Sequence, residues 1–342
     1  MRVLITGGAG FVGQTLAAHL LDLNALTISG ETFAEPVTEL VCFDQSEGSL
    51  KHERLRYVTG DISDAQTVAG LLDDQTPLVF HLAAVVSGSA EADFDLGMRV
   101  NLRGMQNLLE RARDCGHCPS IVFSSSIAVF GGHLPPTITD ETTPLPQGSY
   151  GVQKLICEQL IQDYSRKGFI QGCSLRLPAV LVRPGLPNGA ASGFSSAIIR
   201  EPLADQPMVL PVPPSTEMWA SAPETVAQNL VFAAGLEQSA WGPNRSLNLP
   251  GSIVTIQTAL DMLERLGGPS LLKRVSIEED EAVMALVRTW AARFETPRAL
   301  SLGFKRDAGF EAMVDGYIRR HPEAIKVALR AHAPADQGKR NS

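Results

Sequence analysis

Two side chains near the middle of the chain could together move a proton. Tyr150 and Lys154 are one helical turn apart, so on a helix they lie on the same face. An ammonium beside a phenol favours the phenolate and lowers a pKa that is ordinarily about 10. We therefore expect Tyr150 to act as a general acid/base near neutral pH.

A serine at the end of a predicted strand could complete this pair. Ser126 follows the apolar run that includes Ile121 and Phe123. Its hydroxyl could hydrogen-bond to a reacting oxygen and stabilise a developing alkoxide. A Tyr-x-x-x-Lys pair alone is common on helix surfaces. The serine-ended strand before this pair and the glycine-rich turn near the N-terminus make it specific.

That glycine-rich turn directly follows the first apolar run, residues 2–6. Gly7, Gly10 and Gly13 permit a tight turn, close approach of the backbone to a pyrophosphate, and close packing of a helix on a sheet. The helix that begins there offers its N-terminal amides to phosphates. The turn, with the intervening Phe11 and Val12, is the predicted dinucleotide site.

Asp44 ends the second predicted strand. A carboxylate at this place accepts hydrogen bonds from ribose hydroxyls and repels a 2′-phosphate. The next residues, Gln45, Ser46 and Glu47, include no Lys or Arg. The sequence therefore predicts NAD in preference to NADP. An insertion between residues 23 and 39 makes the gap from Gly13 to Asp44 longer than the usual spacing of about 20 residues.

The elements that must position these residues alternate along the first half of the chain. Apolar runs predict strands and helical spacing predicts helices. Strands are expected at residues 2–6, 39–43, 55–58, 78–82, 121–125 and 172–177, and further helices at 65–72, 94–113 and 150–166. This alternation predicts an α/β fold, a Rossmann-type, doubly wound parallel sheet with right-handed crossovers.

The composition changes near Pro178, after which Pro, Gly, Ala and Ser predict loops and short elements over a cleft. We expect an NAD-binding domain at residues 1–177, with a returning segment at about 221–250. A smaller, mostly helical C-terminal substrate domain is expected to comprise 178–220 and 251–330. Its helices, and one in the returning segment, are predicted at 224–236, 255–266, 280–292 and 310–320. Residues 331–342 resemble a frayed tail.

Charge and apolar patterning exclude several classes of protein. The chain has 37 acidic and 29 basic side chains, which argues against a general affinity for nucleic acid or anionic membranes. No apolar run reaches the roughly 18 residues of a transmembrane helix. The N-terminus lacks the apolar stretch of a signal peptide, so a cytoplasmic location is expected.

The cysteines favour a structural interpretation. Five in a chain without a secretion signal are read as reduced thiols. Cys115-Gly-His-Cys118 resembles a thiol oxidoreductase motif, but Gly116 and Pro119 fit a helix end followed by a new strand. A zinc site needs a second pair of ligands at suitable spacing, and none is found, so no metal is expected.

The sequence resembles the extended short-chain dehydrogenase/reductase, or NAD-dependent epimerase/dehydratase, superfamily over nearly its whole length. The matching segments are TGGAGFVG at 6–13, GDI at 60–62, HLAA at 81–84, NLRG at 101–104, FSSSIAVFG at 123–131 and YGVQK at 150–154. The resemblance implies that Asp61 and Ile62 flank the adenine, and that Ala83, Ala84 and Pro178 contact the cofactor.

The same resemblance implies roles for the catalytic residues and an oligomeric state. Tyr150 would be the acid/base, Lys154 would hold the nicotinamide ribose, and Ser126 would bind a substrate oxygen. Asn101 would contact the cofactor side of the site and support a proton-relay water. The superfamily also implies a homodimer built from the helices that carry Asn101 and Tyr150.

The branch of the superfamily depends on other residues. Dehydratases place an Asp-Glu pair where this chain has Ile127 and Ala128, so simple dehydration is not expected. The stretch 203–223 contains Trp219 but no Lys or Arg, which favours a small substrate over a nucleotide diphosphate. The segments at 125–132, 163–169 and 175–203 are similar to the D-erythronate dehydrogenase group, which oxidises a small sugar acid at C2 with NAD.

A sugar acid needs a partner for its carboxylate, and a guanidinium suits that task. Arg183 and Arg200 are candidates, although either could equally form a structural ion pair. Asn188 and Ser192 are candidates for the substrate hydroxyls, and Ser87, after the fourth predicted strand, is a further one.

The resulting hypothesis is NAD-dependent oxidation of D-erythronate to 2-dehydro-D-erythronate. Tyr150 would take the proton of the C2 hydroxyl while hydride passes to the nicotinamide. Two alternatives stay open. An NAD-dependent nucleotide-sugar epimerase uses the same Ser-Tyr-Lys triad. A non-catalytic NAD(H) sensor is a third interpretation, although sensors usually lose the tyrosine or the lysine.

Overall fold

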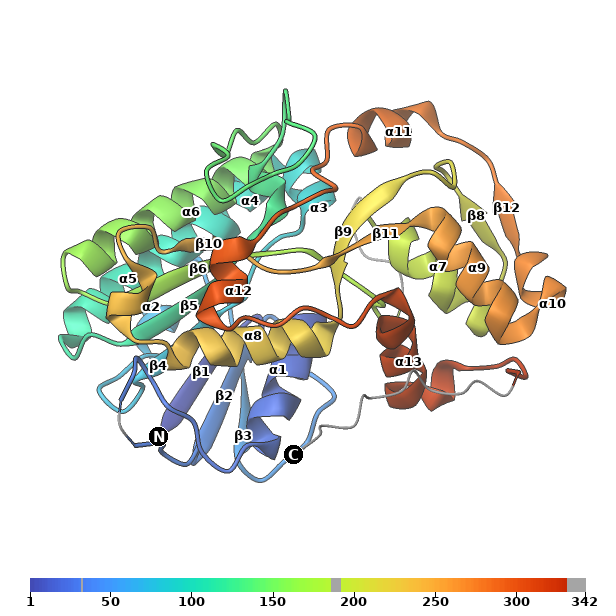
Figure 1. Ribbon diagram of the computed structural model, residues 1–342. Helices are drawn as coiled ribbons and strands as arrows, with labels where there is room; N and C mark the ends of the chain where they lie inside the picture. Colours follow the sequence, from blue (N-terminus) through green and yellow to red (C-terminus); the bar gives the residue numbers. More distant parts are fainter. Residues whose placement is uncertain (32, 186–191, 331–342) are drawn as a thin grey trace.

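The centre of the molecule is a seven-stranded sheet in which every neighbouring pair of strands is parallel (Figure 1). The computed structural model describes residues 1–31, 33–185 and 192–330. In spatial order the strands are β10 (Ser246–Asn248), β6 (Gln171–Leu177), β5 (Ser120–Ser126), β4 (Leu78–His81), β1 (Arg2–Thr6), β2 (Glu39–Asp44) and β3 (Leu55–Thr59). The chain order reverses between β1 and β4, as in doubly wound sheets. The predicted Rossmann-type α/β fold is confirmed.

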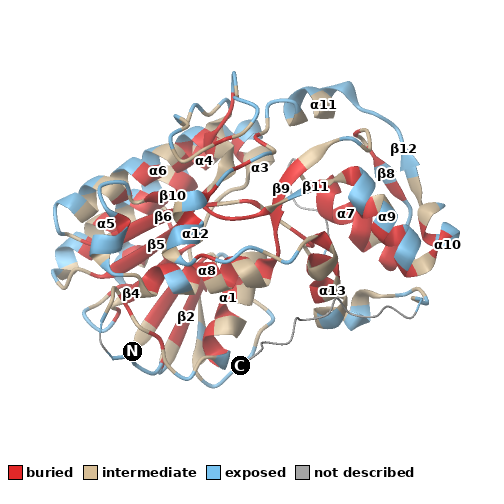
Figure 2. Cartoon of the chain, viewed as in Figure 1, coloured by how far each residue is buried: buried red, intermediate tan, exposed pale blue. Residues whose placement is uncertain are grey.

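Helices cover both faces of this sheet. α1 (Phe11–Asp22) packs against α8 (Pro223–Gly235) on one face, and the other carries α2 (Ala65–Ala69), α5 (Gly104–Cys115) and α6 (Ser149–Arg166). In β1, Val3 and Ile5 belong to one hydrophobic core, whereas Leu4 belongs to the other. Successive side chains of a strand point to opposite faces, so a strand buried on both faces needs a continuous apolar run. Figure 2 shows these central strands as buried.

The helix predicted at 94–113 is continuous but changes its winding. It comprises α4 (Phe94–Gly97), a π-helical turn (Met98–Arg103) and α5, and it follows α3 (Ser87–Ala92), which the sequence did not predict. At the end of α5, Gly116 adopts a left-handed conformation with φ of 71°. All five cysteines are free thiols, and Cys115 and Cys118 flank this helix end as the structural interpretation requires.

The C-terminal part lies beyond the carboxyl ends of the main sheet (Figure 1). Its helices are α7 (Phe194–Leu203), α9 (Ile256–Gly267), α10 (Pro269–Leu272), α11 (Glu281–Val287) and α13 (Phe310–Arg320). Two small sheets accompany them. One contains β11 (Ser252–Thr255), β9 (Glu217–Ser221) and β7 (Ala179–Val180), and the other contains β12 (Val275–Ile277) and β8 (Met208–Leu210). These strands are too short to show a periodicity, so the sequence indicated only loops and short elements between 178 and 223.

Two segments lie elsewhere than the chain order suggests. α12 (Pro297–Leu302) packs against β10, so one helix of the range 251–330 belongs with the first sheet. The insertion before β2 also packs there: Ser29 N donates to the Ala234 oxygen (2.7 Å) at the end of α8. This insertion enters β2 at Glu39, whereas Asp44 ends that strand, so it lies away from the edge that carries the predicted cofactor residues.

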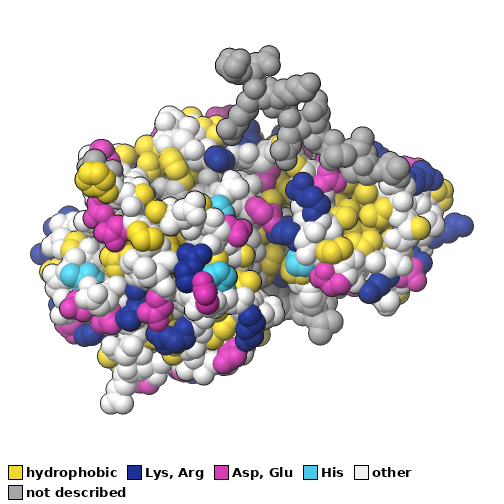
Figure 3. Space-filling model, turned by 90° about the horizontal axis from the view of Figure 1, so that it is seen from below, with side chains coloured by type: hydrophobic (Ala, Val, Ile, Leu, Met, Phe, Trp, Pro, Cys, Tyr) yellow, Lys and Arg dark blue, Asp and Glu magenta, His cyan; other side chains and the backbone are white. Residues whose placement is uncertain are grey.

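The surface shows charges of both signs. Figure 3 shows Lys and Arg side chains interspersed with Asp and Glu on the face seen from below. No helix in the described part of the chain is long and apolar enough to cross a membrane.

Candidate active site

A cavity of about 550 Å³ lies at the carboxyl ends of the central strands. Open doubly wound sheets bind ligands in the crevice outside these strand ends. The cavity wall includes residues at the ends of β1, β2, β4, β5 and β6, and it continues along β7 and β9. The first sheet and the C-terminal part therefore both contribute to one site.

The glycine turn forms one end of this cavity with no room for side chains. Gly7 N donates to the Phe43 oxygen (2.8 Å), and Gly7 has φ of 75°. A Cβ on Gly7 would lie 2.7 Å from Ala83 N, and one on Gly13 would lie 2.1 Å from the Gly7 oxygen. No side chain caps the N-terminus of α1, so its first amides can face an anion. The turn fits the pyrophosphate of a dinucleotide.

Asp44 is fixed at the edge of the same cavity. Its Oδ2 accepts a hydrogen bond from Ala9 N (3.0 Å) and its Oδ1 accepts one from Gln45 N (2.7 Å). Among the described residues that line the cavity, the cations are Lys154 and Arg183, and neither comes from the β2 end. A ribose with free hydroxyls fits this arrangement.

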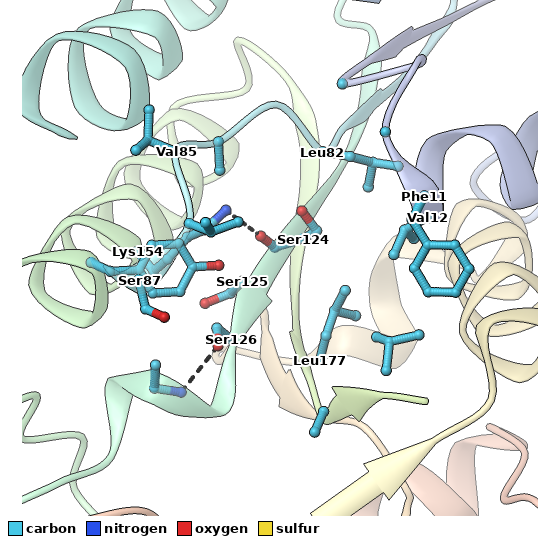
Figure 4. A pocket seen from close by; sticks show the side chains of 18 of the residues that line it. Phe11, Val12, Leu82, Val85, Ser87, Ser124, Ser125, Ser126, Lys154 and Leu177 are labelled. Carbon is cyan, nitrogen blue, oxygen red and sulfur yellow. Dashed lines mark hydrogen bonds between the residues drawn. The ribbon is translucent and has the colours of Figure 1, made fainter. Parts of the chain in front are cut away.

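Ser126, at the end of β5, and Tyr150 and Lys154, in the first turns of α6, line the same cavity. Figure 4 shows Ser126 and Lys154 in its wall. Lys154 Nζ donates to the Ser124 oxygen (2.8 Å) and lies 5.6 Å from the centroid of the Tyr150 ring. Ser126 Oγ accepts a hydrogen bond from Ala128 N (3.1 Å), and the Ser126 hydroxyl acts to lower the pKa of Tyr150. Of the three consecutive serines, Ser126 is the one that affects the pKa of the phenol.

Its two neighbours are engaged elsewhere. Ser124 Oγ donates to the His81 oxygen (3.2 Å), and Ser125 Oγ donates to Glu158 Oε1 (2.5 Å). Successive side chains alternate in direction along β5, so Ser125 points away from Ser124 and Ser126. Because Ser124 is bonded to the His81 oxygen, Ser126 is the hydroxyl of that face left for the phenol.

The pKa values differ from the sequence expectation. Burial raises the pKa of Tyr150 to about 12, and the hydrogen bond with Ser126 acts in the opposite direction. Burial also lowers the pKa of Lys154 to about 8. The lowered phenol pKa predicted from the Tyr-x-x-x-Lys spacing is not found in this structure, because desolvation of the phenol outweighs the favourable interactions.

Two predicted site residues lie outside the cavity wall. Asn101, in the π-helical turn, accepts a hydrogen bond from Val85 N (2.7 Å) and donates to Gln153 Oε1 (2.7 Å). Asn101 therefore connects the loop after β4 to α6 from outside the cavity wall. Asp61 accepts hydrogen bonds from the backbone and side chain of Ser63, while the neighbouring Ile62 lines the cavity.

The substrate candidates divide in a similar way. Ser87, Arg183 and Ser192 line the cavity. Arg200 does not: it pairs with Glu201 (2.6 Å) and donates to the Arg183 oxygen (3.1 Å). Burial and the charge of Arg200 lower the pKa of Arg183. Asn188 lies outside the described residues.

The other predicted cofactor contacts, Gly10, Phe11, Val12, Ala84 and Pro178, also line the cavity. Sequence reasoning missed several wall residues, among them Val85, which follows the predicted Ala84, and Glu217, Met218, Trp290 and Ala291 from distant segments. Trp290 and Ala291 follow the exposed helix α11, where no strand-end or motif signal marks them. Glu217 stands two residues before Trp219, which the sequence had singled out, and that proximity was the available signal.

Comparisons with known proteins show the family of the chain. The model of the NAD dependent epimerase/dehydratase family matches residues 3–218. The chain belongs to this family. A D-erythronate dehydrogenase of Cupriavidus necator is 47% identical over 93% of this chain and 98% of that protein. One of Haemophilus influenzae is 40% identical over 93% of this chain and 99% of that protein.

A solved structure described as a nucleoside-diphosphate-sugar epimerase from Agrobacterium tumefaciens superposes with a TM-score of 0.86. It is 37% identical and covers 95% of each chain. Membership of the epimerase/dehydratase family confirms the predicted resemblance and implies a nicotinamide cofactor, which the glycine turn and Asp44 fit. Because the chain belongs to this family and is similar to D-erythronate dehydrogenases over most of its length, it is a dehydrogenase of the short-chain dehydrogenase/reductase type.

Proposed function

We propose that this protein oxidises D-erythronate to 2-dehydro-D-erythronate with NAD. The observation that carries the proposal is one cavity that joins a dinucleotide turn, the residues Ser126, Tyr150 and Lys154, and the guanidinium of Arg183. The D-erythronate dehydrogenases that resemble the chain over nearly its full length support the same substrate.

In the proposed mechanism, Tyr150 Oη takes the proton of the C2 hydroxyl. Ser126 Oγ donates a hydrogen bond to the same oxygen and holds it near the phenol. Lys154 places a positive charge beside the phenol, which favours the phenolate. When bound, the nicotinamide ring supplies the acceptor for the hydride from C2. Asn101 holds the loop after β4, and so acts on the shape of the site from outside it.

NAD in preference to NADP follows from Asp44. Its carboxylate is held by two backbone amides and faces the cavity, where a ribose hydroxyl can donate to it. A 2′-phosphate there would bring negative charge beside a carboxylate.

The direct test measures NADH formation by the purified protein with short sugar acids, with NAD or NADP, and with UDP-sugars. We expect a clear rate with D-erythronate and NAD, and a much lower rate with NADP. Tyr150→Phe should bind NAD normally and lose at least about 100-fold in kcat, since the proton acceptor is removed. A Tyr150→Phe variant with most of its turnover overturns the acid/base assignment.

The same test decides the epimerase alternative. Slow interconversion of a UDP-sugar, without net NADH and without a rate on any acid, would assign the protein to that class. The cavity favours the acid: its described lining has one cation, Arg183, besides Lys154, and a diphosphate brings more negative charge than a single carboxylate.

A second prediction concerns the substrate carboxylate. We propose Arg183 as its partner, because Arg183 lines the cavity whereas Arg200 does not. Arg183→Ala should raise KM for D-erythronate by about 10-fold or more, because a charge-assisted hydrogen bond is lost. KM for the neutral polyol erythritol should change little. Equal effects on both compounds would remove Arg183 from this role.

We also propose a homodimer that packs through α4 and α6. Phe94 on α4 is 59% exposed, and Val152 and Ile156 on α6 are 41% and 37% exposed. Val152 and Ile156 are one turn apart and therefore share a face of α6. Apolar side chains gathered on neighbouring helices are typical of a subunit interface.

A further inference from the structure

Two carboxylates line the described part of the cavity, and one of them has no role in the proposed function. Asp44, at the end of β2, is assigned to the cofactor ribose. Glu217 begins β9 and lies beside Met218 and Trp219, in the part of the wall contributed by the C-terminal half of the chain. An ionised side chain beside a pocket for an anionic substrate needs an explanation.

Glu217 is held by a guanidinium through both of its oxygens. Arg293 Nε donates to Oε2 (2.6 Å) and Arg293 Nη2 donates to Oε1 (2.6 Å). These hydrogen bonds lower the pKa of Glu217, so the group is ionised at neutral pH. The pair has no net charge, and an acid that enters the cavity is therefore not repelled by it.

The backbone around Arg293 is itself fixed. Ile138 N donates to the Arg293 oxygen (2.9 Å), and Glu295 N donates to the Ile138 oxygen (2.9 Å). The intervening Phe294 packs its ring against Trp219, with ring centroids 5.4 Å apart, and Trp219 is a wall residue two positions from Glu217. This packing fixes the positions of the Arg293 guanidinium and the Glu217 carboxylate before any substrate binds.

The two hydrogen bonds from Arg293 leave Glu217 able to accept further ones. An ionised carboxylate has about four lone-pair positions, and Arg293 uses one on each oxygen. Arg293 is on the outer side: it lines a neighbouring hollow of about 450 Å³, whereas Glu217 lines both spaces. The remaining positions can accept hydroxyl groups from a molecule in the cavity.

We propose that Glu217 determines specificity by accepting hydrogen bonds from the substrate hydroxyls beyond C2, with Arg293 as its positioning residue. The inference rests on the proposed oxidation of a sugar acid. It names the residue that recognises the hydroxyl groups of this substrate beyond C2. A hydroxy acid of the same length without those hydroxyls gains nothing from Glu217.

The test compares D-erythronate with D-2-hydroxybutyrate, which has four carbons and a single hydroxyl at C2. Glu217→Gln should lower the ratio of kcat/KM for D-erythronate over D-2-hydroxybutyrate by about 10-fold or more, since hydrogen bonds to a charged acceptor are lost. The value for D-2-hydroxybutyrate should stay the same or rise, because Arg293 then adds a positive charge near the cavity. If its turnover is too slow, its competitive inhibition constant against D-erythronate supplies the comparison.

Arg293→Ala separates positioning from recognition. It leaves the charge of Glu217 uncompensated, so KM should rise for both acids, and the preference for D-erythronate should also fall. The matched control is Glu281→Gln, which removes one charge from another Glu-Arg pair, Glu281 with Arg288, on the exposed helix α11. We expect the control to leave both acids unchanged.

The outcomes distinguish this inference from the function on which it rests. A wild-type protein that oxidises no hydroxy acid overturns both. A wild-type protein that oxidises D-erythronate, with an unchanged substrate ratio in Glu217→Gln, overturns the specificity role alone. A ratio that falls equally in Glu281→Gln would also overturn it, because the effect would then be one of overall charge.

Discussion

At the scale of single residues, the site depends on a competition between burial and charge. Burial raises the pKa of Tyr150 to about 12, yet the proposed reaction needs the phenolate. Lys154 Nζ lies 5.6 Å from the centroid of the Tyr150 ring and is the cation that we propose opposes this effect, and burial lowers its own pKa to about 8. The ammonium is therefore present below pH 8 and is lost as the pH rises above it.

A pH profile tests this competition. In the wild type, kcat/KM for oxidation should rise with pH as Tyr150 loses its proton. Lys154→Met removes the charge that favours the phenolate, so this limb should move to higher pH by about one unit or more. At pH 7 the loss should be about 10-fold or more, and the gap should narrow at high pH. A uniform loss with the limb in its original place would instead assign Lys154 to binding alone.

At the scale of elements, a residue far along the chain caps a helix of the first sheet. Asp307 Oδ2 accepts hydrogen bonds from Ser221 Oγ (2.6 Å) and Ala222 N (3.1 Å), and Oδ1 accepts one from Thr225 Oγ1 (2.6 Å). These groups lie at the N-terminus of α8, where a negative charge is favourable. α8 in turn packs on α1, the helix that begins at the glycine turn.

Removal of this cap should destabilise the protein without touching the cavity. Asp307→Ala should lower the free energy of unfolding by about 1–3 kcal/mol, since a cap and two hydroxyl partners are lost together. Denaturant unfolding measures this change, and Glu279→Ala, at an exposed loop position, is the control. A variant as stable as the wild type would show that solvent satisfies these groups equally well.

At the scale of the whole molecule, the exposed apolar side chains of α4 and α6 predict how two chains associate. The double variant Val152→Glu, Ile156→Glu places charges on the proposed interface and should convert a dimer into a monomer. Analytical ultracentrifugation measures the change. Ile253→Glu, at an isoleucine on β11 that is 47% exposed, should leave the mass unchanged. A wild-type monomer, or a double variant that remains dimeric, would contradict the proposed interface.

Local patterns in the sequence were sufficient for six of the seven strands of the first sheet, all except β10, and for one side of the cavity. The buried strands are continuous apolar runs, so their bounds agree with the prediction to within one or two residues. Gly7, Gly13 and Asp44 are recognisable because turn geometry and ribose binding demand particular residue types at fixed offsets from a strand. The Tyr150 and Lys154 pair follows from helical spacing in the same way.

The remaining wall was decided by tertiary structure, because its parts are distant in sequence and lack a local signature. Glu217, Trp290 and Arg293 meet only when the segment after α11 runs back beside Ile138 and β9. The direction of the Tyr150 pKa also depends on burial, which spacing does not express. The separation of Arg183 from Arg200 is only partly of this kind: Glu201 directly follows Arg200 in the sequence, whereas it is packing that places Arg183 at the cavity.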